Sequence, residues 1–232
     1  MKYLWEKFNI KTFPARPAVF VDGVFDSELS DMENTKIQTS GDTVEITVLK
    51  PDDLPVHIIY VGEIAGDKKI IIRNPVRGAL YFSVKLKNKS PAFLRFFIEN
   101  AGKYSETRGD IVIQNESDLT LNITADHLAE NTGIFVKTRV LAHGGSATDL
   151  YAAANVLADC RNCESDIGLS AMCAPDIKSI KMSPNQKIAS VPELAEHSAS
   201  IYKGTKPQIE FLAIAGLSLG QIKQTLQDAF LN

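Results

Sequence analysis

The segment Leu80-Tyr-Phe-Ser-Val-Lys-Leu-Lys87 alternates between apolar and mostly polar residues at every step. Successive side chains of a β-strand point to opposite faces, so a period of two predicts a strand with one buried and one solvated face. Thr43–Val48 has the same period, with Val44, Ile46 and Val48 on one face. Both segments are therefore expected to be half-buried strands.

Further strands are expected around these two segments, because short apolar runs recur with only brief turns between them. The turns are rich in Asn, Asp, Ser and Gly, and none is long enough to contain a crossover helix. The chain up to about residue 140 is therefore expected to be all-β, as a sandwich, a barrel or a β-helix. No strict repeat length is visible, and the pattern alone slightly favours an antiparallel β-sandwich. The additional expected strands are Ile70–Ile72, Phe93–Ile98, Ile111–Ile113, Leu119–Ile123 and Ile134–Leu141.

Two shorter segments have their own signals. Asp22-Gly23 lies between apolar residues of Val19–Leu29, and an Asp-Gly pair predicts the tight turn of a hairpin. Thr148–Cys160 fits either a helix or a strand. Its leucines and alanines have helical spacing, and alanine is the best helix former, so the residues themselves favour a helix there.

A first C-terminal helix is expected near 206–215. Thr205 and Gln208 have the spacing of a capping box, and Pro207 is favourable in the first turn. Gly216 occupies the position after the last helical residue where glycine commonly ends a helix.

A second helix is expected near 219–230, because the same start signal repeats. Ser218 and Gln221 form another capping box, and Leu217 and Ile222 are spaced as a hydrophobic staple. Two consecutive helices therefore close the sequence.

Composition places the chain among ordinary globular proteins. Of 232 residues, 44% are hydrophobic and 23% are charged, which is enough apolar material for a core. The net charge of −3 and the absence of a Lys/Arg cluster argue against nucleic-acid binding. We find no Walker A loop, dinucleotide fingerprint, nucleophile elbow or H-E-x-x-H motif.

The sequence also predicts a cytoplasmic protein without a membrane segment. Met1–Lys7 carries charges where a signal peptide needs its apolar core, and the uncharged stretch Phe211–Leu219 is too short to span a bilayer. The three cysteines lie within fourteen residues, and their odd number does not suit a disulfide framework.

Cys160-Arg-Asn-Cys163 is half of a possible metal site, since two thiolates three residues apart can share one tetrahedral ion. Cys173, His143 and His197 are the candidates for further ligands. A CxxC pair alone is a weak signal, and the thiols could equally be inert residues of a β-core.

Histidines give little further information on their own. Glu196-His197 lies in an expected strand, and a single histidine is more often structural than ligating. His57, His127 and His143 lie in turn-like contexts, and we predict no role for them.

The C-terminal part of the chain resembles the end of the SufB/SufD family of iron–sulfur cluster assembly scaffolds. Members contain a P-x-(I/L)-x-I strand, an H-x-A strand and a helix pair in this order. Val19–Leu29 also resembles a stretch that precedes the core in SufD-type members. Ala215 stands where the family usually has arginine. The matching residues are Pro175–Ile180, Val191 with Glu196–Ile201, Gln208–Ser218 and Ala229-Phe230.

The resemblance implies a short family member that lacks the helical N-terminal domain. It implies a right-handed parallel β-helix over 35–204, preceded by an N-terminal extension and hairpin over 1–34 and followed by a helical segment over 205–232. Stacked turns of unequal length would explain the irregular strand spacing. In this fold Thr148–Cys160 contains a strand, which is the assignment that we favour.

The resemblance also implies a function and a site. Cys163-Glu164-Ser165 is similar to a motif whose cysteine helps to build the nascent cluster, and members place a histidine, often after a glutamate, at the position of Glu196-His197. Cys163 and His197 would be metal ligands, and Glu196 would join them in binding a transient iron–sulfur cluster, with no stable cofactor.

The expected partners follow from the same family. A SufC-like ABC ATPase would bind the C-terminal helices, and the chain would form a homodimer, or a heterodimer with another SufB/SufD-type scaffold. The protein would then be a scaffold and not itself an enzyme. The residues expected to contact the ATPase are Phe211, Leu212, Leu219, Ile222, Leu226 and Phe230.

Two other classes remain open from the sequence. A β-helix enzyme acting on carbohydrate would need an open groove lined by several acids and aromatic residues, and the acids of this chain are dispersed over turns. The chain could also be a structural or binding β-protein with inert cysteines.

Overall fold

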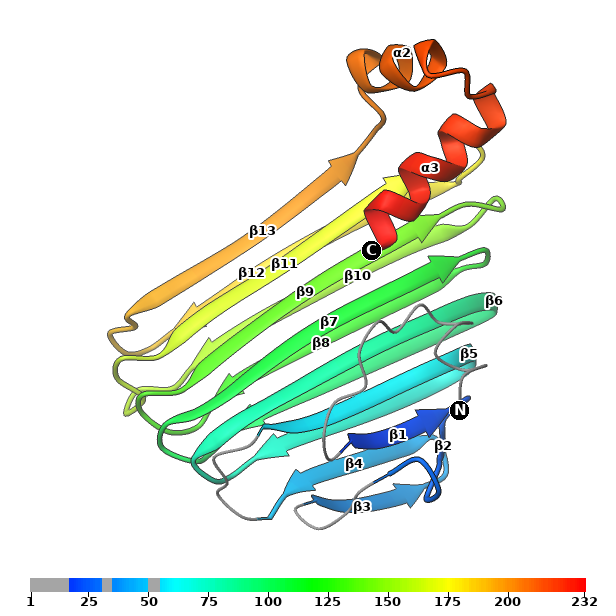
Figure 1. Cartoon of the computed structure of the whole chain (residues 1–232). Coiled ribbons are helices and arrows are strands. Elements are labelled where there is room, and N and C mark those ends of the chain that lie inside the picture. Colours follow the sequence, from blue (N-terminus) through cyan, green and yellow to red (C-terminus); the bar gives the residue numbers. More distant parts are fainter. Residues whose placement is uncertain (1–16, 31–34, 50–54) are drawn as a thin grey trace.

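A computed structural model describes residues 17–30, 35–49 and 55–232 and forms a β-solenoid of about six turns with parallel strands. Figure 1 shows the strands stacked from β1–β4 at one end to β13 near the other, with two helices beyond β13. The elements are β1 (Pro17–Val21), β2 (Val24–Phe25), β3 (Thr35–Ser40), β4 (Thr43–Val48), β5 (Val56–Asn74), β6 (Gly78–Asn100), β7 (Ser105–Asn115), β8 (Leu119–His127), β9 (Gly133–Ala142), β10 (Ala147–Val156), β11 (Glu164–Cys173), β12 (Ser179–Ile188), β13 (Leu194–Tyr202), α2 (Lys206–Ile214) and α3 (Leu219–Leu231).

The solenoid has two sheet faces, and the long strands β5 and β6 contribute to both. The first half of β6 (78–88) pairs with β7, and its second half (92–100) pairs with β8. One face therefore continues through β7, β9, β11 and β13, and the other continues through β8, β10 and β12. Every pairing between successive turns is parallel, so the parallel β-helix is confirmed and the alternative of an antiparallel sandwich is wrong.

Unequal turn lengths explain why the sequence shows no strict repeat. Val56 pairs with Leu80, which is 24 residues further along the chain, whereas Ala152 pairs with Pro184, which is 32 residues further along. The additional residues lie in the corners, which tolerate insertions because they run over the surface. Antiparallel pairing among the described strands is limited to β1 with β2 and β3 with β4.

The core lies between the two faces and is filled by the alternating apolar side chains. Leu80, Phe82, Val84 and Leu86 are all buried, as their period of two predicts. The Phe82 and Phe96 rings, from the two halves of β6, are stacked with 6.3 Å between their centroids. Aromatic and aliphatic side chains from opposite faces therefore meet in one continuous core.

Gly109 leaves room for the Phe82 ring in this core. A Cβ atom added at Gly109 would lie 1.9 Å from Phe82 Cζ, closer than any real contact. We therefore expect Gly109→Val to lower the free energy of unfolding by about 3 kcal/mol through overpacking, measured by urea denaturation. Gly168→Val is the control, because a Cβ there would approach only the Ser198 hydroxyl, at 3.3 Å. Equal denaturation midpoints for the two variants would contradict the prediction.

The N-terminal hairpin and the strand over 148–160 are both confirmed. β1 and β2 pair antiparallel around Asp22 and Gly23, which have φ angles of 51° and 82°. Residues 1–16 and 31–34 of the expected N-terminal segment lie outside the described residues. β10 is a strand because it pairs along its whole length with β8 and β12, and this pairing overrides the helical preference of its alanines.

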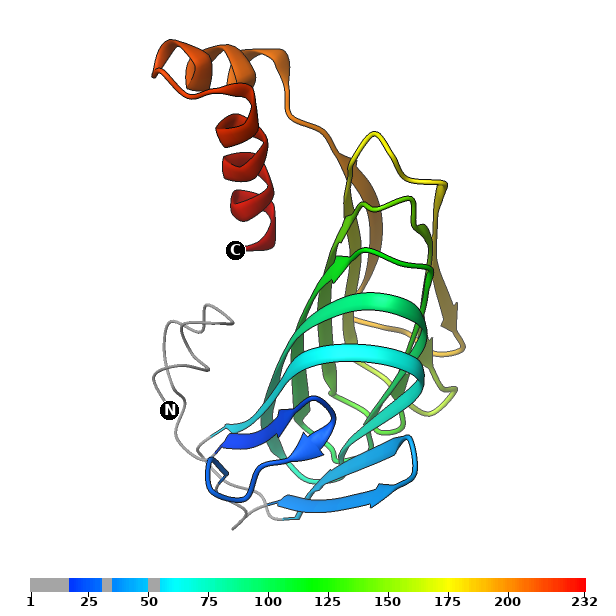
Figure 2. The same ribbon diagram turned by 90° about the vertical axis from the view of Figure 1, so that its right-hand side faces the viewer.

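Both helices begin as expected, and each has a complete capping box. The backbone N–H groups of Gln208 and Gln221 donate to the Thr205 and Ser218 hydroxyls, and Gly216 ends the first helix with a φ angle of 87°. Figure 2 shows α3 running beside a sheet face of the solenoid, and α2 lying further from the sheet. Among the described residues, no helix is long and apolar enough to cross a membrane.

Candidate functional site

Cys163 and His197 lie in successive turns but not side by side. His197 pairs with Ile167 in the β11–β13 register, four residues beyond Cys163. Four residues at 3.3 Å each separate them by about 13 Å along the strand direction. A single chain therefore does not bring this thiol and this imidazole together.

Glu196 and His197 are exposed on the last strand of the solenoid. Because neighbouring side chains of a strand point to opposite faces, the Glu196 carboxylate points outward and the His197 ring points toward the solenoid interior. Ile167, the residue that pairs with His197 from the preceding turn, is buried because β11 has a strand on each side. His197 has a strand on one side only, because β13 is an edge strand. His197 thus lies at the open end of the apolar core.

Cys163 is buried at the corner before β11. Its Sγ atom lies 3.3 Å from the Thr132 hydroxyl and 3.4 Å from the Ala129 carbonyl oxygen. The Glu193 backbone N–H donates to the Cys163 carbonyl, so the chain of the last turn covers the residue. We call His127, Thr132, Cys160 and Cys163 the corner cluster.

His127 is the fourth residue of the corner cluster, although its turn-like sequence context predicts no role for it. Its Nδ1 atom lies 2.7 Å from the Thr132 hydroxyl, and this hydroxyl is 3.1 Å from the Ala129 carbonyl oxygen. If the hydroxyl donates to the carbonyl, Nδ1–H must donate to the hydroxyl, which leaves Nε2 as the unprotonated nitrogen. Nε2 is buried without a partner, and burial lowers the pKa of His127 to about 4.

The two thiols of the corner cluster are protected from solvent. Cys160 Sγ lies 3.1 Å from the His127 carbonyl oxygen and packs with Cys163 and Val156. Burial raises the pKa of Cys160, and the neighbouring Cys163 raises it further. A thiol with a raised pKa is a poor nucleophile and a poor ligand at neutral pH. In this closed arrangement the corner cluster is a hydrogen-bonded part of the core.

Titration of His127 predicts a loss of stability in mild acid. The unfolded histidine has a pKa near 6.5 and the folded one near 4, so the unfolded state binds the extra proton. The stability that depends on a neutral His127 is fully present above pH 6.5 and is lost as the pH falls through 4. The corresponding decrease in the free energy of unfolding is about 3 kcal/mol. We expect His127→Leu to flatten the dependence of the free energy of unfolding on pH between 6.5 and 4. Identical slopes for wild type and His127→Leu would refute this assignment.

The other expected metal ligands lie elsewhere. Cys173 ends β11, ten residues beyond Cys163, which separates the two by roughly 33 Å along the strand. His143 follows β9 at that same far end and lies 3.9 Å from a Glu116 carboxylate oxygen. In the described ranges, no three His, Cys, Asp or Glu side chains are grouped to hold a metal ion.

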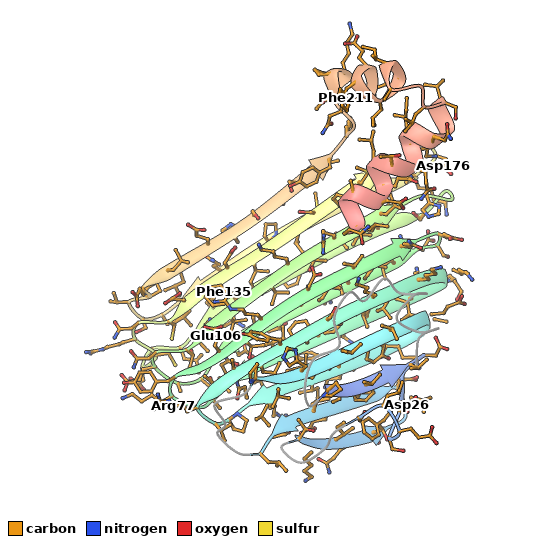
Figure 3. All side chains as sticks on the ribbon, viewed as in Figure 1. Asp26, Arg77, Glu106, Phe135, Asp176 and Phe211 are labelled. Atoms are coloured by element: carbon orange, nitrogen blue, oxygen red, sulfur yellow. The ribbon has the colours of Figure 1, made fainter. Side chains whose placement is uncertain are left out.

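The residues expected to contact a partner divide into two groups. Phe211 and Leu219 are 71% and 79% exposed, and Phe211 lies on α2, beyond the end of the strands (Figure 3). Ile222 is buried, and Phe230 contacts the Tyr202 ring with 5.3 Å between centroids. Leu212 and Leu226 are half-buried, and Ile214, which adjoins Phe211, is 87% exposed. We call Phe211, Ile214 and Leu219 the apolar ridge.

The two edge strands at the C-terminal end differ in how they discourage pairing. β12 carries Pro184 at its middle and exposed Lys181 and Lys187 on either side, and these residue types protect sheet edges from association. β13 contains no proline and no lysine, and Glu196 is its only acid. Each of these strands pairs with one described strand only. The open edge of β13 is therefore the less protected one.

A groove near the corner cluster gathers acids that are far apart in the sequence. It is lined by Glu106, Glu164 and Glu193 together with Tyr104 and Phe135. Glu106 and Phe135 lie near the same ends of neighbouring strands (Figure 3), with the Glu106 side chain and the Phe135 ring both close to Gly133. The expectation that the acids stay dispersed over turns is thus wrong for these three.

The sequence contains a signal for His127 that its turn-like context concealed. The alternation of Leu119, Leu121, Ile123 and Ala125 continues to residue 127, which places the histidine on the buried face of β8. Extending the period of two by one step would have placed His127 in the core.

Comparison with known proteins gives no family for the chain. No protein-family model and no curated protein sequence matches it. What the geometry itself defines is a class: a β-solenoid with one open end and a helical pair that carries an exposed apolar ridge.

Proposed function

We propose that the chain is a scaffold component of a SUF-type iron–sulfur cluster assembly system. Its C-terminal helices would bind a SufC-like ABC ATPase, and its open solenoid end would bind a second scaffold subunit. The sequence resemblance to the SufB/SufD family suggested this assignment, and a cytoplasmic location is part of it. The nascent cluster is the cargo of the scaffold in this proposal.

The apolar ridge is the observation that carries the proposal. Phe211, Ile214 and Leu219 are large apolar residues at the far end of the molecule from β1, and all three are mostly exposed. Exposing three large apolar residues on a short helical pair is costly in water unless a partner covers them. A scaffold needs such a docking surface, whereas an enzyme that works alone does not.

The second supporting feature is the position of Glu196 and His197 on the open edge of β13. A two-fold pairing of two chains through this edge would present two equivalent sets of carboxylate and imidazole. Cys163 lies one turn inside, so its thiolate would reach the cargo only after the corner before Leu194 opens. Imidazole, carboxylate and thiolate are suitable transient ligands for iron.

Substitution of the two expected ligands tests the cluster role. We expect Cys163→Ser and His197→Ala, made separately, to remove most of the iron and sulfide bound after anaerobic reconstitution with the ATPase present. Cys173→Ser is the matched control, because Cys173 lies at the other end of β11. If neither Cys163→Ser nor His197→Ala lowers the bound iron relative to Cys173→Ser, both residues are structural and the cluster site is refuted.

The groove at Glu106, Glu164 and Glu193 is a reason to consider carbohydrate binding as an alternative function. The groove's aromatic rings, however, already have cations over them. Arg108 lies 4.5 Å from the centroid of Phe135, and Lys103 lies 5.5 Å from that of Tyr104. Ring faces that are occupied in this way are poorly placed to stack on a sugar. We therefore favour the scaffold function over this alternative.

A further inference from the structure

A cavity separates the C-terminal helices from the last turn of the solenoid. It has a volume of about 320 Å³, which lies within the range of small-molecule sites. Met172 and Ala174 line it from the solenoid, and Ile209, Ile222 and Leu226 line it from the helices. Its walls are thus mainly apolar.

The charged groups that line this cavity are all cations. They are Lys203, in the connection after β13, and Lys223 on α3. Neither lysine forms an ion pair within the described parts of the chain, whereas Lys206 nearby is paired with Glu210. An apolar hollow with two unpaired ammonium groups is complementary to a molecule with an apolar body and one anionic head.

The space continues beyond this first cavity. A second cavity of about 340 Å³ shares Met172, Tyr202, Lys203, Gly204 and Leu226 with the first and extends the space toward Arg139.

Gly204 lines both cavities. A Cβ atom there would lie 2.7 Å from Leu226 Cδ1, so the absence of a side chain allows the connection and α3 to approach each other closely. A slender alkyl chain is the shape that suits two adjoining hollows of this kind.

We propose that this groove binds one long-chain fatty acid, with its alkyl chain along Ile222 and Leu226 and its carboxylate between Lys203 and Lys223. The site lies on the side of α3 that faces the solenoid. Leu219 of the apolar ridge and Tyr202 at the end of β13 also line the cavity. Binding there does not require the scaffold function, because neither an ATPase nor a second subunit takes part in it.

Titration of the full-length protein with cis-parinaric acid, a fluorescent fatty acid, tests the proposal. We expect saturable binding that weakens at least tenfold in the double variant Lys203→Ala/Lys223→Ala. The double variant Lys181→Ala/Lys187→Ala removes the same charge from β12 and should bind like the wild type. Competition by 1-hexadecanol, which has no carboxylate, should be equally effective in wild type and Lys203→Ala/Lys223→Ala.

Alkylation of Cys173 is a second test of the position of the site, and it does not depend on substituting the lysines. It lines the cavity and is partly exposed, whereas Cys160 and Cys163 are buried. Burial raises the pKa of Cys173, and Lys203 partly opposes this effect, so iodoacetamide alkylation is best followed at alkaline pH. We expect palmitate to slow alkylation of Cys173 severalfold, with Cys173→Ser giving the background from the other thiols. Absence of saturable binding, equal binding by both double variants, or unchanged alkylation of Cys173 would each overturn the proposal.

Discussion

Removal of residues 205–232 is expected to abolish binding of a SufC-like ATPase while the solenoid remains folded. The deleted segment contains the whole apolar ridge, and α2 has no buried residue. The solenoid core is built from residues of the strands, none of which comes from the helices. The solenoid loses the contact of Leu231 with Val112 and Leu141, and burial of one such side chain contributes about 2 kcal/mol.

Pull-down of the ATPase by wild type and by the truncated chain, with circular dichroism as the check on folding, measures this prediction. A double variant, Phe211→Asp/Ile214→Asp, should reduce binding nearly as much without deleting the helices, because both residues are exposed. Gln224→Asp/Thr225→Asp places the same charge on exposed positions of α3, outside the apolar ridge and the capping box, and should leave binding intact. Retained binding by the truncated chain would refute docking through these helices, even if the fatty-acid site proved correct.

The strands and helices could be predicted from the sequence because their signals are local. The alternation in Leu80–Leu86 reports directly which side chains are buried, and the capping boxes at Thr205 and Ser218 fix where each helix begins. The choice between sandwich and solenoid is not local. It depends on which strand each strand pairs with, and turns of 24 to 32 residues conceal that register.

The candidate site was harder to predict because it depends on where the solenoid stops. His197 follows the same inward alternation as Ile167, and only the absence of a further described strand beyond β13 leaves it exposed. The corner cluster joins residues from successive turns, such as Thr132 and Cys163, which are 31 positions apart. Sequence spacing alone does not indicate such a contact, and it had instead grouped Cys163 with the distant Cys173.

Lysine substitutions on the edge of β13 are expected to change the oligomeric state. If two chains pair through this edge, Ala199 and Ile201, whose side chains point toward the open end of the core, would face the partner. Ala199 is exposed and Ile201 is 50% exposed in the single chain, so lysines there should be tolerated by the monomer. Inward-pointing charge on an edge strand strongly opposes pairing.

We therefore expect wild type to be a dimer and Ala199→Lys/Ile201→Lys to be a monomer, with the dimer dissociation constant raised at least tenfold because two buried charges per subunit would lose their hydration. Size-exclusion chromatography with light scattering measures the mass directly. The control variant Ser183→Lys/Asn185→Lys adds the same charge to β12. Pro184 already disfavours pairing through the edge of β12, so this variant should remain dimeric. A wild-type monomer, or a dimer unaffected by lysines on β13, would show that this edge is not the interface, and Glu196 and His197 would then have no second subunit with which to form a cluster site.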